Sequence, residues 1–100
     1  MVDRCKNILK TIDNYLKPSE QIFIDCGDMS FCFRKKYITP YGKEMPHIYV
    51  KKKDGSVVDY NISMFCYLAT TIREYQVVLE YLENAINTNI NSLRKVSIYV

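Results

Sequence analysis

The chain has 100 residues, 48% of them hydrophobic and 25% charged, which is typical of one globular domain. No apolar run approaches the roughly 18 residues of a membrane span, and the N-terminus is amphipathic and charged. The composition therefore excludes a membrane helix, and we expect no signal peptide. The net charge of +3 is modest, so its distribution matters more than its size.

The four cysteines show no C-x-x-C spacing, and they are Cys5, Cys26, Cys32 and Cys66. Without a secretory signal, they predict reduced, mostly buried thiols in an intracellular protein of the nucleus or cytoplasm. Abundant Lys, Ile, Asn and Tyr, with no Trp, is typical of AT-rich genomes such as those of some large DNA viruses. A viral protein acting in the host cell is included in this expectation.

The first predicted element is a helix over residues 3–17, with Asp3 as its N-cap and Pro18 at its end. Its apolar residues recur at helical spacing, and they are Cys5, Ile8, Leu9, Ile12 and Leu16.

Four antiparallel strands are predicted next, within residues 21–62: 21–26, 29–38, 47–52 and 56–62. The sequence TPYG at 39–42 favours a β-turn, and Asp54-Gly55 favours a two-residue type I′ hairpin. This hairpin would pair Tyr49 with Tyr60 and Lys51 with Val58 on one face. The other face would pair Ile48 with Asn61 and Val50 with Asp59. Neither face is then cleanly apolar, so alternation does not say which one packs on a helix.

A long helix is predicted over residues 63–88, with Ser63 as its N-cap, and a terminal strand over 94–100. The predicted fold class is therefore α+β: a four-stranded antiparallel sheet packed by a long amphipathic helix, with an N-terminal helix and a short terminal strand, in one domain spanning 1–100.

The apolar stripe of the long helix runs from Phe65 to Ile86, or roughly 30 Å at 1.5 Å per residue. Strands of this length cover only about 17–27 Å, so the stripe is longer than the sheet requires. We therefore expect a symmetric homodimer through this helix. The predicted interface residues are Tyr75, Val78, Leu79, Leu82 and Ile86.

Catalytic signals are weak. The one histidine, His47, stands beside a proline at a strand start, where a surface or packing role is more common. No P-loop, dinucleotide fingerprint, nucleophile elbow or zinc spacing occurs. We expect neither an enzyme nor a bound cofactor or metal.

The positive charge is concentrated in the middle of the chain. Residues 34–53 hold seven basic side chains and one acidic residue, Glu44, whereas acidic residues exceed basic ones over 63–90. Lysine is a poor strand former, so Lys51, Lys52 and Lys53 before a turn invite two explanations. They protect a sheet edge from pairing with other chains, or they belong to an anion-binding face. Cations interleaved with aromatic residues suit single-stranded nucleic acid, because cations neutralise phosphates and aromatic rings stack bases.

Three segments together resemble the PC4-like family of transcriptional coactivators: FCFRKKYI, IYVKKKDGSVV and NISMFCYLATTIREYQVVLEYLENAI. They cover about two-thirds of the chain. The resemblance implies a dimer through the helices and basic, aromatic sheets that bind single-stranded DNA. By position it implies phosphate contacts at Arg34, Lys36, Lys51 and Lys53 and stacking at Tyr37 and Tyr49.

The sequence thus predicts a homodimer that binds single-stranded nucleic acid, DNA by the resemblance, and serves transcription or replication together with proteins of those processes. The alternative is a non-enzymatic protein-interaction or regulatory module without nucleic-acid binding, in which the lysines only solubilise the sheet.

Overall fold

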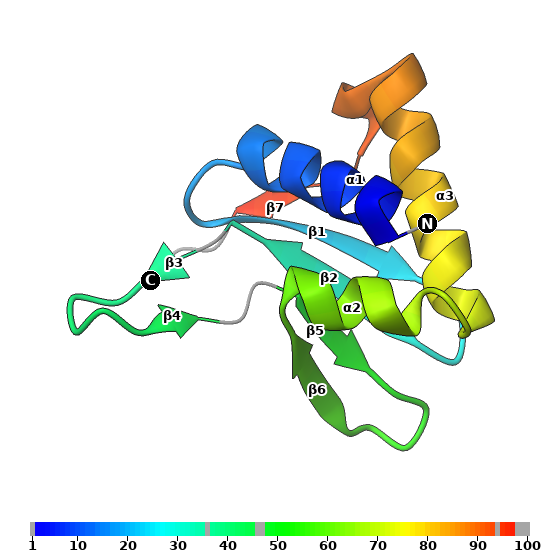
Figure 1. Ribbon diagram of the computed structural model, residues 1–100, viewed down its shortest axis with the longest axis horizontal. Coiled ribbons are helices and arrows are strands. Elements are labelled where there is room, and N and C mark those ends of the chain that lie inside the picture. The colour runs from blue at the N-terminus through cyan, green and yellow to red at the C-terminus, as the bar shows by residue number, and fades with distance from the viewer. Residues whose placement is uncertain (1, 36, 46–47, 94, 98–100) are drawn as a thin grey trace.

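A computed structural model describes residues 2–35, 37–45, 48–93 and 95–97 (Figure 1). The elements, in chain order, are α1 (Val2–Tyr15), β1 (Glu20–Asp25), β2 (Ser30–Arg34), β3 (Tyr37–Ile38), β4 (Glu44–Met45), β5 (Ile48–Lys51), β6 (Val57–Tyr60), α2 (Ile62–Leu68), α3 (Arg73–Thr88), η1 (Ile90–Ser92) and β7 (Lys95–Ser97). The α+β class predicted from the sequence is confirmed.

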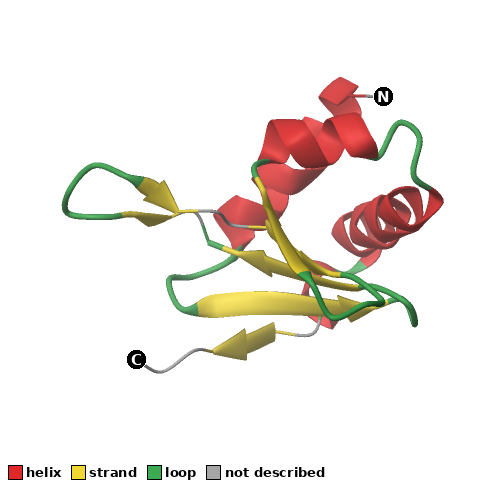
Figure 2. Cartoon of the chain, turned by 90° about the horizontal axis from the view of Figure 1, so that it is seen from below, coloured by secondary structure: helices red, strands yellow, loops and turns green. Residues whose placement is uncertain are grey.

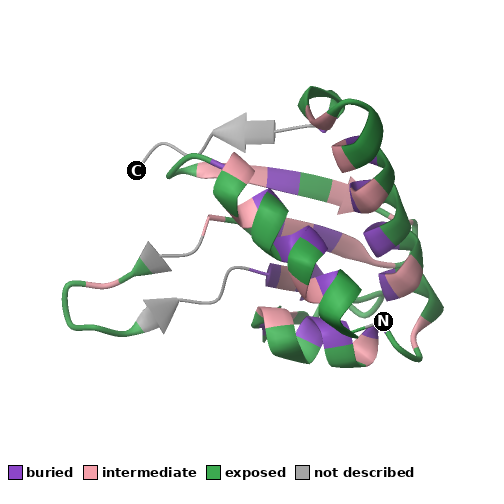
Figure 3. Cartoon of the chain, turned by 45° about the horizontal axis from the view of Figure 1, so that its top comes forward, coloured by how far each residue is buried: buried purple, intermediate pink, exposed green. Residues whose placement is uncertain are grey.

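Five strands form one antiparallel sheet in the order β6-β5-β2-β1-β7. Along β1, β2, β5 and β6, residues alternate between a buried face and an open face, as the burial colours of Figure 3 show. The helices gather over the buried face, and in the described part of the chain no helix covers the open face (Figure 2). The buried face carries Ile22, Phe31, Phe33, Ile48, Val50 and Tyr60.

The predicted N-terminal helix is present as α1. Its predicted apolar face is buried against the sheet and the other helices, with Cys5, Ile8, Leu9, Ile12 and Leu16 in the core. An ion pair between Arg4 and Glu83 ties α1 to α3, and the Arg4 Nε donates to Glu83 Oε2 at 2.6 Å.

The β5–β6 hairpin has a three-residue loop rather than the predicted two-residue turn. The Lys52 N–H donates to the Ser56 carbonyl at 2.8 Å, and the Gly55 N–H donates to the Lys52 carbonyl at 2.9 Å. Gly55 has φ +88°, the left-handed conformation that completes a three-residue loop of this kind. Asp54 accepts hydrogen bonds from the Ser56 N–H and hydroxyl, which holds its carboxylate inside the loop.

This loop shifts the pairing by one residue, so the predicted register is wrong. Ile48 pairs with Tyr60 and Tyr49 with Asp59. Because a one-residue shift moves every side chain of a strand to the other face, Tyr60 joins Ile48 on the buried face. The buried face becomes apolar toward the helices, while the open side is mostly polar or aromatic, with Val57 as an exposed aliphatic residue on it.

The predicted continuous helix over 63–88 is also wrong, because the chain forms two helices. The first, α2, ends at Leu68, and Ile72 is extended (φ −94°, ψ 118°) before α3 begins. The hydroxyls of Thr70 and Thr71 donate to the carbonyls of Tyr67 and Leu68 at 2.6 and 3.4 Å. Three β-branched residues in a row, two of which compete for helix carbonyls, explain the interruption.

The N-cap of α2 is Asn61 instead of the predicted Ser63. Its side-chain Oδ1 accepts a hydrogen bond from the Met64 N–H at 2.8 Å. Asparagine is as good an N-cap as serine, so the helix starts at the earlier residue.

Aromatic rings fill the space between the sheet and the two helices. Phe31 of β2 contacts Phe65 of α2 and Tyr75 of α3 edge to face, with ring centroids 6.1 and 5.3 Å apart. The Tyr75 and Tyr60 hydroxyls are hydrogen-bonded at 3.0 Å. The pKa of Tyr75 is raised by burial and by this bond, so the buried phenol stays neutral.

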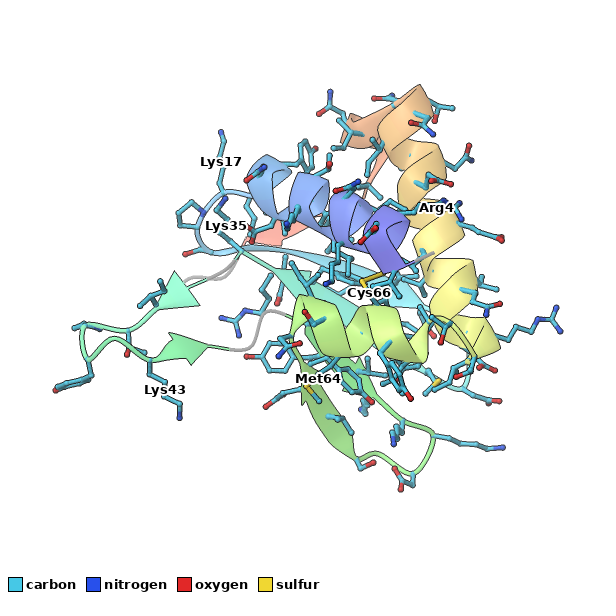
Figure 4. All side chains as sticks on the ribbon, in the orientation of Figure 1. Arg4, Lys17, Lys35, Lys43, Met64 and Cys66 are labelled. Atoms are coloured by element: carbon cyan, nitrogen blue, oxygen red, sulfur yellow. A yellow bond between two sulfur atoms is a disulfide. The ribbon has the colours of Figure 1, made fainter. Side chains whose placement is uncertain are left out.

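Cys5 and Cys66 form a disulfide between α1 and α2, with Cα atoms 5.6 Å apart (Figure 4). Both residues are buried. The prediction of four reduced thiols is therefore wrong for this pair, because helices distant in sequence meet over the same sheet. Cys26 and Cys32 are free.

The predicted strand 29–38 is interrupted, and its outer part forms a separate two-stranded hairpin of β3 and β4. We call residues 37–45 the arm. Figure 1 shows the arm projecting away from the sheet and helices. The predicted terminal strand is present within 95–97 as β7, which pairs with β1 at Glu20–Ile22, while residues 94 and 98–100 lie outside the described residues.

Candidate nucleic-acid interface

The open face of the sheet brings three of the predicted nucleic-acid residues together. Arg34 ends β2, and Tyr49 and Lys51 lie on the adjacent strand β5. In the observed register, Tyr49 stands between Cys32 of β2 and Asp59 of β6, so all of these side chains share the open face.

Arg34 and Tyr49 form one unit. The Arg34 guanidinium carbon lies 5.4 Å from the centroid of the Tyr49 ring, and Arg34 Nη1 donates to the Tyr49 hydroxyl at 3.3 Å. This is a cation–π contact on an accessible surface, since Arg34 is exposed and Tyr49 half-buried. The unit therefore offers a ring and a planar guanidinium, both of which stack nucleic-acid bases.

The charges on the open face are ordered by strand. The two adjacent strands β2 and β5 carry Arg34 and Lys51, while the exposed carboxylates Asp59 and Asp25 lie on the flanking strands β6 and β1. A polyanion on this face would be attracted along β2 and β5 and repelled at the sides. We call these two strands with Arg34, Tyr49 and Lys51 the basic stripe.

Lys53 lies in the β5–β6 loop at one end of the basic stripe, and both Lys52 and Lys53 are exposed there. The backbone of Tyr37 belongs to β3, beyond the sheet end where Arg34 lies. Lys36, another predicted phosphate contact, and His47 lie outside the described residues.

Lys35 is basic and close to these residues in sequence, yet it turns away from them. Its Nζ donates to the Asp13 carbonyl at 2.8 Å and lies 3.8 Å from the Asp13 carboxylate, at the end of α1 (Figure 4). One of the seven basic side chains of the central cluster therefore stabilises the contact between the sheet and α1.

The open face also holds a thiol that the sequence did not single out. Cys32 lies beside Tyr49, and its Sγ is 3.1 Å from Gln21 Oε1, to which it donates. Burial raises the pKa of Cys32 to about 11, against a smaller opposing effect of Arg34. Cys32 is therefore protonated and unreactive at neutral pH.

The predicted dimer interface lies largely inside the chain. Tyr75, Val78, Leu79 and Leu82 are buried against the sheet and the other helices, and Ile86 is half-buried. The helix break removes the reason for expecting a partner, because α2 and α3 are separate and each covers part of the same sheet. The homodimer itself stays a prediction.

A second surface, which we call the groove, lies between the end of β1 and α3. It has a volume of about 370 Å³, and its lining includes Phe23, Cys26, Val77 and Tyr81. Phe23, Val77 and Tyr81 are each almost half exposed. Burial raises the pKa of the Cys26 thiol, as do the negative charges of Asp25 and Glu74, so the surroundings of the groove are acidic. The alternation in QIFID, with Phe23 between two inward isoleucines, was the available sequence signal.

None of the helices within the described ranges is long and apolar enough to cross a membrane. Comparisons with protein-family models, curated proteins and solved structures gave no match to this chain.

Proposed function

We propose that this chain binds single-stranded nucleic acid along the basic stripe, as the resemblance to PC4-like coactivators implies for transcription or replication. The observation that carries the proposal is the Arg34–Tyr49 unit, set next to Lys51 on a sheet face that no helix among the described residues covers. Base stacking on aromatic and guanidinium planes is tolerant of sequence, and lysines neutralise phosphates without reading bases.

The direction of binding follows from the order of charges. The phosphate chain would run parallel to β2 and β5, entering at Lys51 and the loop lysines and passing over Tyr49 and Arg34. Asp25 and Asp59 on the flanking strands disfavour a path across the sheet.

The test measures binding by fluorescence anisotropy with a labelled oligo-dT of about 16 nucleotides, and with a duplex of equal length, from about 20 to 200 mM salt. Wild-type protein should prefer the single strand. Lys51→Ala should weaken binding and reduce the slope of log affinity against log salt by about 0.7. Lys10→Ala, an exposed lysine on α1, is the matched control and should change neither.

Tyr49→Ala should weaken binding about 5- to 150-fold, the range for one stacked base, with an almost unchanged salt slope. Tyr49→Phe keeps the ring and should retain most of the affinity. Wild-type protein that binds no oligonucleotide at 20 mM salt would contradict the proposal.

The interaction-module alternative is favoured by one observation, the groove. Its apolar lining, with Asp25 and Glu74 nearby, suits an extended peptide that carries an aliphatic side chain between basic residues. This alternative takes precedence if the oligonucleotide titration fails.

A further inference from the structure

We propose that the arm is a second contact for the same single strand, with Tyr41 at its tip stacking on a base. This inference rests on the proposed function. It adds a site that lies outside the sheet.

Tyr41 is 96% exposed, and Ile38, at the base of the same hairpin, is 58% exposed. Figures 1 and 2 show that the arm extends away from the rest of the chain. An isolated two-stranded hairpin is only marginally stable in water. An aromatic side chain presented in this way has its whole ring available to a ligand.

The tip is nevertheless ordered by its own hydrogen bonds. The Thr39 N–H donates to the Lys43 carbonyl at 2.8 Å, and the Thr39 carbonyl accepts from the Gly42 N–H at 2.9 Å. The Lys43 N–H donates to the Thr39 hydroxyl at 3.0 Å, and Gly42 has φ +81°. Pro40 fixes the backbone before Tyr41. The turn therefore presents Tyr41 in a preformed position, which lowers the entropy lost on binding.

The arm continues the basic stripe. It leaves β2 after Arg34 and returns to β5 before Tyr49, so it begins at the sheet end that holds the Arg34–Tyr49 unit. Three residues (34–36) lie between the last β2 residue paired with β5 and the start of β3, and two residues (46–47) lie between the end of β4 and the start of β5. The strand register therefore changes by one residue between the sheet and the arm. Seven residues from Arg34 to Tyr41 allow a reach of at most about 23 Å.

Continuity with the basic stripe favours a nucleic acid over the other possible occupants. The arm itself contains one lysine, Lys43, and one acidic residue, Glu44, so its net charge alone does not select the ligand. Lys43 is exposed beside the tip and points away from the arm (Figure 4). A phosphate chain lying on the basic stripe already reaches Arg34 at the base of the arm, so its continuation is attracted to Lys43.

The experiment uses the absence of tryptophan from the chain. Tyr41→Trp places one tryptophan at the tip, and Tyr67→Trp places one at a 73% exposed position of α2, on the helix side, as the matched control. Saturation with 16-residue oligo-dT should quench the fluorescence of Trp at 41 and leave that of Trp at 67 nearly unchanged. A four-residue oligo-dT is too short to span both contacts and should quench much less. Tyr41→Ala should weaken binding of the long oligonucleotide about fivefold or more and leave the short one unaffected.

Several outcomes would overturn the inference. The arm contact is refuted if the wild-type protein binds, the fluorescence of the Tyr41→Trp variant does not change and Tyr41→Ala keeps full affinity. The proposed function is then unaffected. Equal quenching at 41 and 67 also refutes it. A concentration-dependent change in Trp fluorescence at 41 without nucleic acid assigns the tip to a second copy. No binding by wild-type protein removes both proposals.

Discussion

Reduction of the Cys5–Cys66 disulfide should strongly destabilise the protein. The bond joins α1 to α2, and both sulfur atoms are buried in the core between the helices and the sheet. When the bond is reduced, the folded state keeps almost all of its contacts. The loss therefore comes mainly from the unfolded chain, which gains conformational freedom.

The sequence separation of the two cysteines gives the magnitude. They are 61 residues apart, and the chain-entropy relation for a loop of this size gives about 14 cal/mol/K, or about 4 kcal/mol at 25 °C. In a domain of 100 residues this corresponds to a fall in Tm of about 20 °C. Since the free energy of unfolding of small domains is only about 5–15 kcal/mol, the reduced protein would keep little stability.

The assay is thermal unfolding of oxidised protein and of protein refolded in a phosphine reductant. Thiol counts in guanidinium should give two before reduction and four after it. Cys26→Ala should show the same fall in Tm on reduction, whereas Cys5→Ala/Cys66→Ala should show none. Oxidised and reduced wild-type protein with Tm values within about 3 °C would refute the reasoning.

Two further predictions concern the core and the free thiols. Leu82→Asp should unfold the protein rather than release folded monomers, because Leu82 is 0% exposed. Val77→Asp, at a 46% exposed position of the same helix, should leave the protein folded. Circular dichroism and sedimentation separate these outcomes, and a folded Leu82→Asp monomer obtained from a wild-type dimer would restore the predicted helix interface. Burial raises the pKa of Cys32 to about 11 and so disfavours the thiolate form in the folded state. Alkylation of Cys32 by iodoacetamide, followed by mass spectrometry, should therefore speed up about tenfold per pH unit up to about pH 11. An alkylation rate that levels off near pH 9 would contradict the burial effect.

The sequence predicted those helices, strands and turns that depend on local signals. The period of α1, the turn at 39–42 and the strands β1 and β6 follow from apolar spacing and from Pro, Gly and Asp positions. The register of the β5–β6 hairpin did not follow, because an Asp-Gly pair is compatible with a two-residue or a three-residue loop. That single choice decides whether Tyr60 or Asp59 shares the open face with Tyr49.

The remaining differences depend on tertiary contacts. Apolar spacing continues through Leu68 and Ile72 as if one helix ran on, since Leu68 before the break and Ile72 after it pack on the same core. The pairing of Cys5 with Cys66 requires two distant helices to meet, and their spacing in sequence carries no sign of it. Arg34, Tyr49 and Lys51 were singled out from the sequence, whereas Tyr41 was not, because a turn residue gives no indication of how far its hairpin projects.

The disulfide also makes the chain from Cys5 to Cys66 a covalent ring, and the arm lies within that ring. Cleavage after Tyr41 by an aromatic-specific protease would open the ring without separating its pieces, because residues 1–41 and 42–100 would stay linked through sulfur. Nicked protein would therefore migrate as one species until a reductant divides it into two. The oxidised molecule can thus lose the continuity of the arm and still keep both halves of its backbone together.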